Sequence, residues 1–425
     1  GGDSNWFTGN NWDSTFVPGD GADAVIGSGA TVLLTNSTAA LNSLNISSAT
    51  LIFTNWPTTL NATNVTIGSG GILTHAICDT NPVMSNTNRV RILCTNLTVA
   101  AGGAINVDGK GYLGKQATDG QGPGGAIATT YAGGGGHGSK GGDAGGGTSV
   151  GGPPYGSAAT PLLPGSAGSG GSAAQGAKGG NGGGVIRVDA AGAVDVDGTL
   201  SADGETGASQ WSGGGAVGSI YVTCRTFDGT GVVRAQGKDG GYFLCGGGGG
   251  GRIAIGYNAA DQSGVTPTPT VQFSAYGAND RYAGRTGPGT LRLSDNSFVP
   301  ESFTTNTISD VALSGFASWA PAALSVRDTW IVFSEPDFNL TAGGDTVVTG
   351  AWGKLAFSNG TPAINIGGNL VVTNNARLFV YSGATNGVAP DYGALGSVTG
   401  DVLIASNTWV YPYSEPVNGG SPLFR

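Results

Sequence analysis

The chain has little of what α-helices need. Of its 425 residues, 82 are glycine, only 11% are charged and a single one is methionine. Glutamate occurs four times and lysine six times, so the residues that favour exposed helix positions are almost absent. This composition excludes a helical bundle, a coiled coil and an α/β nucleotide-binding fold, because each of these needs many helices.

Basic residues and long apolar runs are also scarce. Asp and Glu (27) outnumber Lys and Arg (18), and the formal net charge is −9. The basic residues form no patch, so we expect no nucleic-acid partner. No stretch approaches the roughly 18 apolar residues that span a bilayer, so we expect no membrane insertion. The chain opens Gly-Gly-Asp-Ser-Asn-Trp without a signal peptide. This favours a mature or trimmed secreted protein, extracellular or at the cell surface.

Histidine is limited to His75 and His137, and no CxxC motif occurs. A zinc site is therefore not expected. We predict that His75 is packed and that His137, which lies in a run of glycines, is solvated. The commonest acid–base group near neutral pH is thus nearly unavailable for catalysis.

The four cysteines form two pairs that are 16 and 21 residues apart in the sequence. Strands in adjacent coils of a β-solenoid lie about 4.8 Å apart, within the Cα separation that a disulfide tolerates. We therefore predict disulfides Cys78–Cys94 and Cys224–Cys245, formed in an oxidising compartment. The alternative is four buried free thiols.

Short apolar runs recur every 8 to 20 residues over most of the first hundred residues, separated by Gly, Asn or Ser. Such spacing, with no helix between the runs, is typical of stacked coils. Alternation is clearest at 185–255, where Ile186 and Val188 face one way and Arg187 and Asp189 the other. The same alternation places further polar side chains on the outward face: Asp195, Asp197, Ser201 and Asp203. We predict an all-β solenoid.

Composition divides the chain into four sections. Residues 1–100 are predicted to form N-terminal β-helix coils and a cap, 185–300 central coils, and 301–425 a further C-terminal β section. Residues 101–184 form a Gly-rich insertion, with 32 glycines in 84 residues. Interspersed tyrosines and leucines favour an ordered bundle of extended, polyproline II-like segments, packed closely because no Cβ intervenes. A flexible low-complexity insertion is the alternative.

The sequence also resembles secreted bacterial proteins. Its opening is similar to that of many bacterial β-helix proteins, including autotransporter-associated and haemagglutinin-like repeats, in four motifs: Trp6, Asn11-Trp12, Val17-Pro18-Gly19 and Asp23-Ala-Val-Ile26. The segments 213–222, 246–255 and 409–420 resemble glycine-rich modules of very large bacterial surface proteins. The resemblance implies secretion and a right-handed parallel β-helix. It carries over no catalytic residue, and the many glycine runs depart from ordinary β-helix pectate lyases.

Two groups of residues are candidates for chemistry. Asp189, Asp195 and Asp197 could bind Ca²⁺ through carboxylate oxygens, or could supply a carboxylate pair for glycoside hydrolysis. A solvated charge ladder is the alternative. We expect no cofactor, and Ca²⁺ is the one ion for which the sequence offers a candidate. The second group is Arg281, Tyr282 and Arg285. It could neutralise a uronate and supply the base of a polysaccharide lyase, or it is simply a polar loop.

The function that these observations favour is structural. We expect a non-catalytic extracellular surface protein, adhesive and self-associating as a filament or surface-layer module. Its main partner would be itself, with an extracellular polysaccharide as a second partner. The alternative is a carbohydrate-active β-helix protein, either a polysaccharide lyase or a glycan-binding adhesin.

Overall fold

The computed structural model describes residues 3–78, 87–128, 130–145, 149–171, 177–241, 244–280, 284–358, 360–383, 393–414, 420 and 422–425. It divides into two compact units, residues 1–290 and 291–425. Each unit consists of parallel strands stacked coil upon coil, which confirms the predicted all-β solenoid. Within the described ranges, no helix has the length and apolarity needed to cross a membrane.

Unit 1 (residues 1–290) has two long parallel sheets. Its first sheet contains β1 (Asp23–Ile26), β3 (Leu41–Ile46), β5 (Leu60–Ile67), β7 (Val90–Val99), β9 (Val185–Ala190), β12 (Ser219–Thr223) and β15 (Arg252–Gly256), with β10 (Ala193–Val196) and β13 (Thr226–Asp228) beside β7. Its second sheet contains β2 (Thr31–Leu34), β4 (Thr50–Phe53), β6 (Ile72–His75), β8 (Ala104–Asn106), β11 (Thr199–Ser201), β14 (Val232–Arg234) and β16 (Gln272–Ser274). Helices are limited, in the described part of this unit, to η1 (Gly9–Asn11) and α1 (Ala259–Gln262).

Apolar side chains of unit 1 stack in register along the solenoid. One column passes through six successive coils, and each of its members is at most 1% exposed: Ala24, Leu44, Val65, Leu97, Val194 and Phe227. The alternation of apolar and polar residues puts one side of each strand into this core. A shift of one residue in any strand would turn its apolar set outward, so burial fixes the register.

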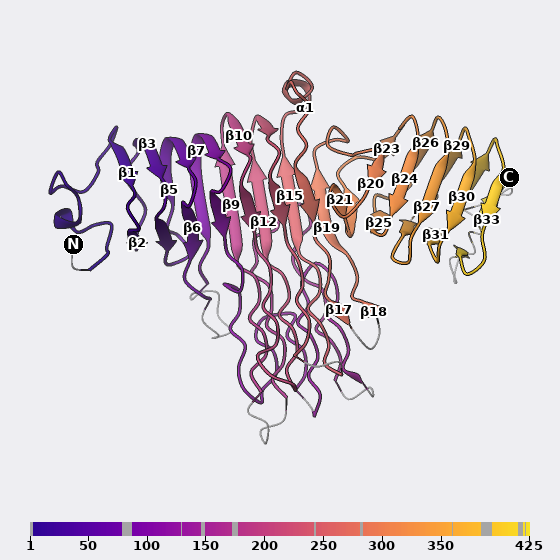
Figure 1. The fold of residues 1–425 in the computed structure, drawn as a ribbon, viewed down its shortest axis with the longest axis horizontal. Helices are drawn as coiled ribbons and strands as arrows, with labels where there is room; N and C mark the ends of the chain where they lie inside the picture. The colour runs from indigo at the N-terminus through magenta and orange to yellow at the C-terminus, as the bar shows by residue number, and fades with distance from the viewer. Residues whose placement is uncertain are drawn as a thin grey trace. The chain divides into compact units, whose positions relative to one another are not determined.

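A glycine-rich arm leaves the coils of unit 1 (Figure 1). It is built from the chain between successive strands, in four stretches: 107–184, 202–218, 235–251 and 275–288. The last stretch carries the short antiparallel pair β17 (Asn279–Asp280) and β18 (Gly284–Arg285). The arm therefore includes more of the chain than the expected insertion at 101–184, because three later stretches pack beside the first.

Backbone hydrogen bonds within the arm repeat every three residues. Residues 213 and 216 donate to the stretch 166–169, residues 214 and 217 to 246–249, and residues 215 and 218 to 202–205. A polyproline II helix has three residues per turn, so each of its three sides faces a different neighbour. This pattern agrees with the ordered, polyproline II-like alternative for the described part of the Gly-rich section.

Close approach of backbones explains the glycines of the arm. A Cβ built on Gly134 would lie 1.9 Å from the carbonyl oxygen of Gly247, and one built on Gly213 would lie 1.9 Å from that of Gly133. Real Cβ atoms never approach an oxygen so closely, so any side chain here would push two segments apart. Glycine is thus required by packing, not by flexibility.

Unit 2 (residues 291–425) has three parallel sheets. The first contains β22 (Val311–Ser314), β25 (Trp330–Phe333), β28 (Lys354–Phe357), β31 (Arg377–Tyr381) and β34 (Trp409–Tyr413). The second contains β20 (Ser302–Phe303), β24 (Leu324–Arg327), β27 (Thr346–Thr349), β30 (Leu370–Thr373) and β33 (Val402–Ile404). The third contains β23 (Ser318–Trp319), β26 (Asn339–Ala342), β29 (Ala363–Ile366), β32 (Leu395–Val398) and β35 (Leu423–Phe424). The strands β19 (Gly289–Leu293) and β21 (Ile308–Ser309) complete the list. The division at residue 290 falls about ten residues before the expected start of the C-terminal section.

Candidate functional site

The three aspartates considered for Ca²⁺ are not brought together. Asp189 registers with Leu93 of β7, whereas Asp195 registers with Thr98 of the same strand. Five residues along a strand correspond to about 16 Å. No group of three His, Cys, Asp or Glu side chains that could hold a metal ion occurs in the part of the chain that the structure describes. The trio therefore does not form one site, and Ca²⁺ remains without a described binding site.

Each of these aspartates has its own surroundings. The carboxylate of Asp195 registers with that of Asp228 on β13, and its pKa is raised by burial, by Asp197 and by Asp228. Asp197 accepts hydrogen bonds from the backbone and hydroxyl of Thr230, at 3.0 and 2.8 Å. Asp195 thus belongs to a partly solvated ladder of charges, and Asp197 holds a corner between two strands. Asp189 pairs with arginines, as described below.

Asp203 and Ser201 are buried, contrary to the outward position expected from strand alternation; Asp203 is 1% exposed. The arm covers this part of the coil: the Nζ of Lys238 lies 3.0 Å, and the Nε of Arg234 3.2 Å, from the carboxylate of Asp203. Burial, and then the nearby Asp108, raise the pKa of Asp203. This ion-pair network ties the base of the arm to the coils.

The residues considered for a lyase cannot be assembled into a site. Arg281 and Tyr282 lie outside the described residues. The backbone of Arg285 pairs with Asn279 in the β17–β18 ribbon, and its side chain is outside the description. The lyase hypothesis therefore stays a prediction from the sequence alone.

The prediction of two disulfides is wrong: all four cysteines are free thiols in the structure. Cys78 follows β6 in the second sheet and Cys94 lies in β7 of the first, so the two are on different walls of the solenoid. Cys224 follows β12, whereas Cys245 lies in the arm, where its Sγ is 3.4 Å from the carbonyl oxygen of Gln210. A spacing near one coil length does not ensure that two residues lie on the same sheet, as Cys78 and Cys94 show, and the arm stretch 235–251 takes Cys245 away from the coils.

The thiols are also poor nucleophiles. Burial is the main cause that raises the pKa of Cys78, Cys94 and Cys224 to about 12. At neutral pH these three side chains are therefore protonated, and the two that are buried, Cys78 and Cys94, are chemically inert.

Both histidines are completely buried, so His75 is packed as expected but His137 is not solvated. The Nε2 of His75 accepts a hydrogen bond of 3.0 Å from the backbone N–H of Val185, and its Nδ1 lies 2.7 Å from the carbonyl oxygen of Ala76. Nδ1 must therefore carry the proton, and the ring is a neutral tautomer. Burial, the largest cause, lowers the pKa of His75 to about 4.

His137 lies inside the arm, with its ring centroid 4.8 Å from that of Tyr155. Neither ring nitrogen has a well-aligned hydrogen-bond partner among the described residues. Burial and then the guanidinium of Arg252 lower the pKa of His137 to about 3, although the backbone of Val217 and Gly218 acts in the opposite direction. The glycine run around His137 suggested exposure because a single segment does not reveal its neighbours in the bundle.

An arginine cluster, missed from the sequence, lies on the first sheet of unit 1. It consists of Arg89, Arg91 and Arg187. Arg91 on β7 registers directly with Arg187 on β9. Arg187 makes a two-pronged pair with Asp189, with N···O distances of 2.8 and 3.2 Å. The only signal in the sequence was the Arg-x-Arg at 89–91, almost a hundred residues before Arg187.

Aromatic rings support two of these guanidiniums. The guanidinium carbon of Arg89 lies 4.3 Å from the ring centroid of Trp56, and that of Arg187 lies 5.7 Å from that of Tyr221. Arg89 is only 6% exposed, and its Nε donates to the carbonyl oxygen of Trp56 at 3.0 Å. Cation–π contacts of this kind hold guanidiniums in fixed orientations.

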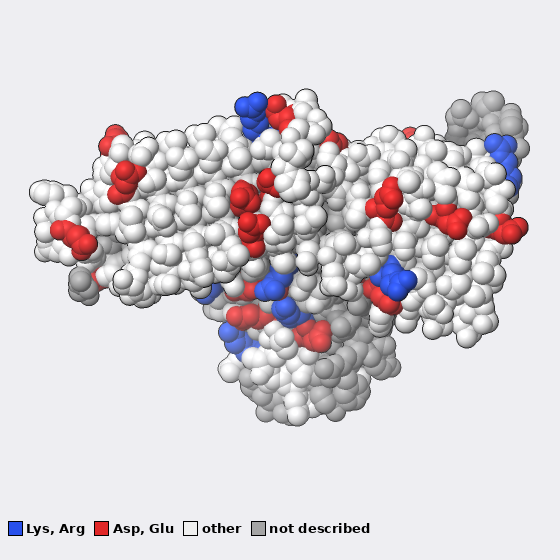
Figure 2. Space-filling view, turned by 45° about the horizontal axis from the view of Figure 1, so that its top comes forward, with Lys and Arg blue, Asp and Glu red and all other residues white. Residues whose placement is uncertain are grey.

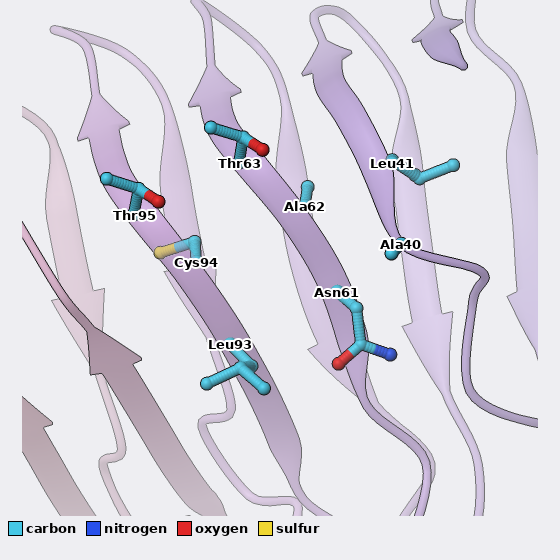
Figure 3. Close-up of a pocket in the computed structure, with 8 residues that line it drawn as sticks. All are labelled: Ala40, Leu41, Asn61, Ala62, Thr63, Leu93, Cys94 and Thr95. Atoms are coloured by element: carbon cyan, nitrogen blue, oxygen red, sulfur yellow. The ribbon is translucent and has the colours of Figure 1, made fainter. Parts of the chain in front are cut away.

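A shallow groove of about 310 Å³ crosses β3, β5 and β7 beside the cluster (Figure 3). Its lining combines small, apolar and hydrogen-bonding side chains: Ala40, Leu41, Asn61, Ala62, Thr63, Leu93, Cys94 and Thr95. Leu93 registers with Asp189 and lies two residues after Arg91 on β7, so one end of the groove lies beside the arginine pair. Charged side chains are sparse over most of the face drawn in Figure 2, which makes such a concentration of guanidiniums uncommon on this chain.

The comparison with protein families matches a G8 domain at residues 11–110. The match covers 100 of the 425 residues (110 − 11 + 1), which are the N-terminal coils through β8 and the start of the arm. Neither the curated proteins nor the solved structures contain a match to the chain. The G8 domain is typical of extracellular proteins, whereas the resemblance to autotransporter-associated and haemagglutinin-like repeats stays a prediction.

Proposed function

We propose that this chain is a non-catalytic structural and adhesive protein of the extracellular surface, which self-associates as a filament or surface-layer module. The similarity of residues 11–110 to G8 domains supports the extracellular setting. The observation that carries the structural role is the arm of unit 1, in which backbones pack with no room for a Cβ. Such a closely packed bundle is a rigid projection from the solenoid, which suits a structural protein.

The state of the titratable groups supports the absence of catalysis. The pKa values of His75 and His137 are about 4 and 3, so both imidazoles are neutral and enclosed at neutral pH. A general acid–base catalyst works best with a pKa near the operating pH and with access to the substrate. The buried thiols, with pKa values of about 12, offer no nucleophile.

Self-association is supported by the exposed strand β33 in unit 2. Its three residues, Val402, Leu403 and Ile404, are 55%, 53% and 48% exposed. Strand edges with exposed apolar side chains are templates for pairing with another chain. We therefore propose β33 as one surface for self-association.

Sedimentation velocity tests this proposal. The purified chain is expected to form oligomers whose size increases with concentration, and Leu403→Lys should shift it to monomers. Ile127→Lys is the matched control, since Ile127 is 57% exposed but lies in the arm of unit 1. A monomer at all concentrations, or oligomers unaffected by Leu403→Lys, would rule out self-association through β33.

The alternative is a carbohydrate-active protein, and the groove at Asn61, Thr63 and Thr95 favours its glycan-binding form. Amide and hydroxyl groups there can exchange hydrogen bonds with sugar hydroxyls. Incubation with pectate, alginate and sulfated fucans, with and without Ca²⁺, separates the cases. Unsaturated products that disappear in Arg281→Ala or Tyr282→Phe would replace the structural proposal with a lyase. Binding without turnover would support adhesion.

A further inference from the structure

The arginine cluster contains more positive than negative charge. Three guanidiniums, of Arg89, Arg91 and Arg187, surround one carboxylate among the described residues, that of Asp189. Burial, Arg91 and Arg187 together lower the pKa of Arg89 to about 10, against the smaller opposing effect of Asp189. Two like charges in register on neighbouring strands are destabilising. A chain with a net charge of −9 nevertheless concentrates them here.

The hydrogen bonds of Asp189 are already taken. Its two oxygens accept from the Nε and Nη2 of Arg187, and Oδ1 also accepts from the hydroxyl of Thr223 at 3.2 Å. The Nε of Arg91 is 3.9 Å from Asp189, too long for a hydrogen bond, and no described residue accepts from it. The Nε of Arg91 is itself buried, so a ligand would meet the exposed part of this side chain.

Both arginines are accessible to a ligand. The side chain of Arg91 is 31% exposed and that of Arg187 is 25% exposed. Neighbouring strands lie about 4.8 Å apart, so two guanidiniums in register can face the oxygens of one anion. Guanidinium groups match the planar geometry of carboxylate and sulfate oxygens and form strong charge-assisted hydrogen bonds with them.

We propose that Arg91 and Arg187 form a binding site for an oxyanion, the carboxylate or sulfate group of an acidic polysaccharide whose chain lies along the adjacent groove. Leu93, on the rung next to Asp189, and the partly buried Tyr221 provide apolar surface beside the anion. The hydroxyl and amide groups of Thr95 and Asn61 line the continuation of the groove. The site goes beyond the structural role and does not depend on self-association at β33.

Isothermal titration with four probes tests this site: a sulfated polysaccharide, a polyuronate, inorganic sulfate and neutral dextran. The wild-type chain is expected to bind the charged polysaccharides but not dextran. Inorganic sulfate separates the sources of the anion: competition by millimolar sulfate indicates that the charged group alone is recognised. No competition indicates that the sugar chain is recognised with it. Binding of dextran equal to that of the charged polysaccharides would overturn the proposal.

Three variants locate the site. Arg91→Gln should weaken the binding of charged polysaccharide about tenfold or more, the effect of losing a charge-assisted hydrogen bond. Arg225→Gln is the matched control, because Arg225 pairs with a single carboxylate, Asp261 at 2.9 Å, outside the cluster. Asp189→Asn should strengthen binding, since it removes the competing carboxylate.

Circular dichroism and thermal unfolding establish that each variant is folded before titration. Equal losses in Arg91→Gln and Arg225→Gln would show a general charge effect and overturn the site. Unchanged or weaker binding in a folded Asp189→Asn variant would also contradict it.

Discussion

Mild acid should destabilise unit 1 through its two buried histidines. His75 and His137 have pKa values of about 4 and 3 in the folded chain, against 6.5 for an unhindered imidazole. Their folded-state pKa values are depressed, so the unfolded chain takes up protons that the folded chain refuses. The contribution of each ring is complete above pH 6.5 and is lost as the pH falls from 6.5 toward the folded-state value.

The size of the effect follows from linkage. Lowering the pH from 7 to 5 protonates nearly every histidine of the unfolded chain and almost none of the folded one. Each ring then reduces the free energy of unfolding by about 2 kcal/mol, or about 4 kcal/mol for the two together. For a unit of this size, that corresponds to a fall of roughly 8 °C in Tm. Ordinary carboxylates contribute little in this window, because most of them titrate below pH 5.

The assay is thermal unfolding followed by circular dichroism between pH 5 and pH 7, in the wild type and in His137→Phe. Phe is the informative replacement, since neither ring nitrogen of His137 has a well-aligned partner among the described residues. The variant should lose about half of the pH dependence. Asp203, whose pKa is raised, works in the opposite direction, because its folded form binds its proton more readily. A Tm that does not change from pH 7 to pH 5, or a slope that His137→Phe leaves intact, would refute the argument.

Two other predictions concern the arm and the thiols. Gly134→Ala should lower the free energy of unfolding by about 3 kcal/mol, because its Cβ would lie 1.9 Å from the carbonyl oxygen of Gly247, whereas Gly19→Ala should be nearly neutral, since nothing lies within 4 Å. Chemical denaturation measures both, and equal stabilities would contradict the close packing. A thiol reagent should label none of the three cysteines with raised pKa values in the native chain and all four cysteines after denaturation; rapid native labelling, or fewer than four thiols after denaturation without reductant, would show the assignment to be wrong.

Local patterns of the sequence were sufficient for the class of fold. The alternation at 185–190 became β9, with Ile186 and Val188 fully buried and Arg187 and Asp189 partly exposed. Period-two alternation depends only on the two faces of a strand, so it survives whatever the distant chain does. It failed at Ser201 and Asp203, where a second layer, the base of the arm, covers the outward face.

Long-range relations could not be deduced from spacing. Cys78 follows β6 of the second sheet whereas Cys94 lies in β7 of the first, and Cys224 follows β12 whereas Cys245 lies in the arm, so neither predicted pair meets in register on neighbouring strands. A disulfide needs Cα atoms within about 7 Å, and no rule of sequence distance predicts which coils the arm sets apart. The arginine cluster was missed for the same reason, since Arg91 and Arg187 become neighbours only after the intervening chain has gone out through the arm and returned.

The excursion between β8 and β9 determines which charged side chains become neighbours in this part of unit 1. It places Arg187 directly after Arg91 in the stack, as though the 78 intervening residues, 107–184, were absent. Two like charges, Arg91 on β7 and Arg187 on β9, therefore lie side by side on neighbouring strands. Asp189 is hydrogen-bonded to Arg187 and Thr223 but not to Arg91, whose Nε is buried and has no acceptor among the described residues. The positive charge that Asp189 does not balance, at a point where the chain returns from the arm, is the charge that the proposed anionic ligand would neutralise.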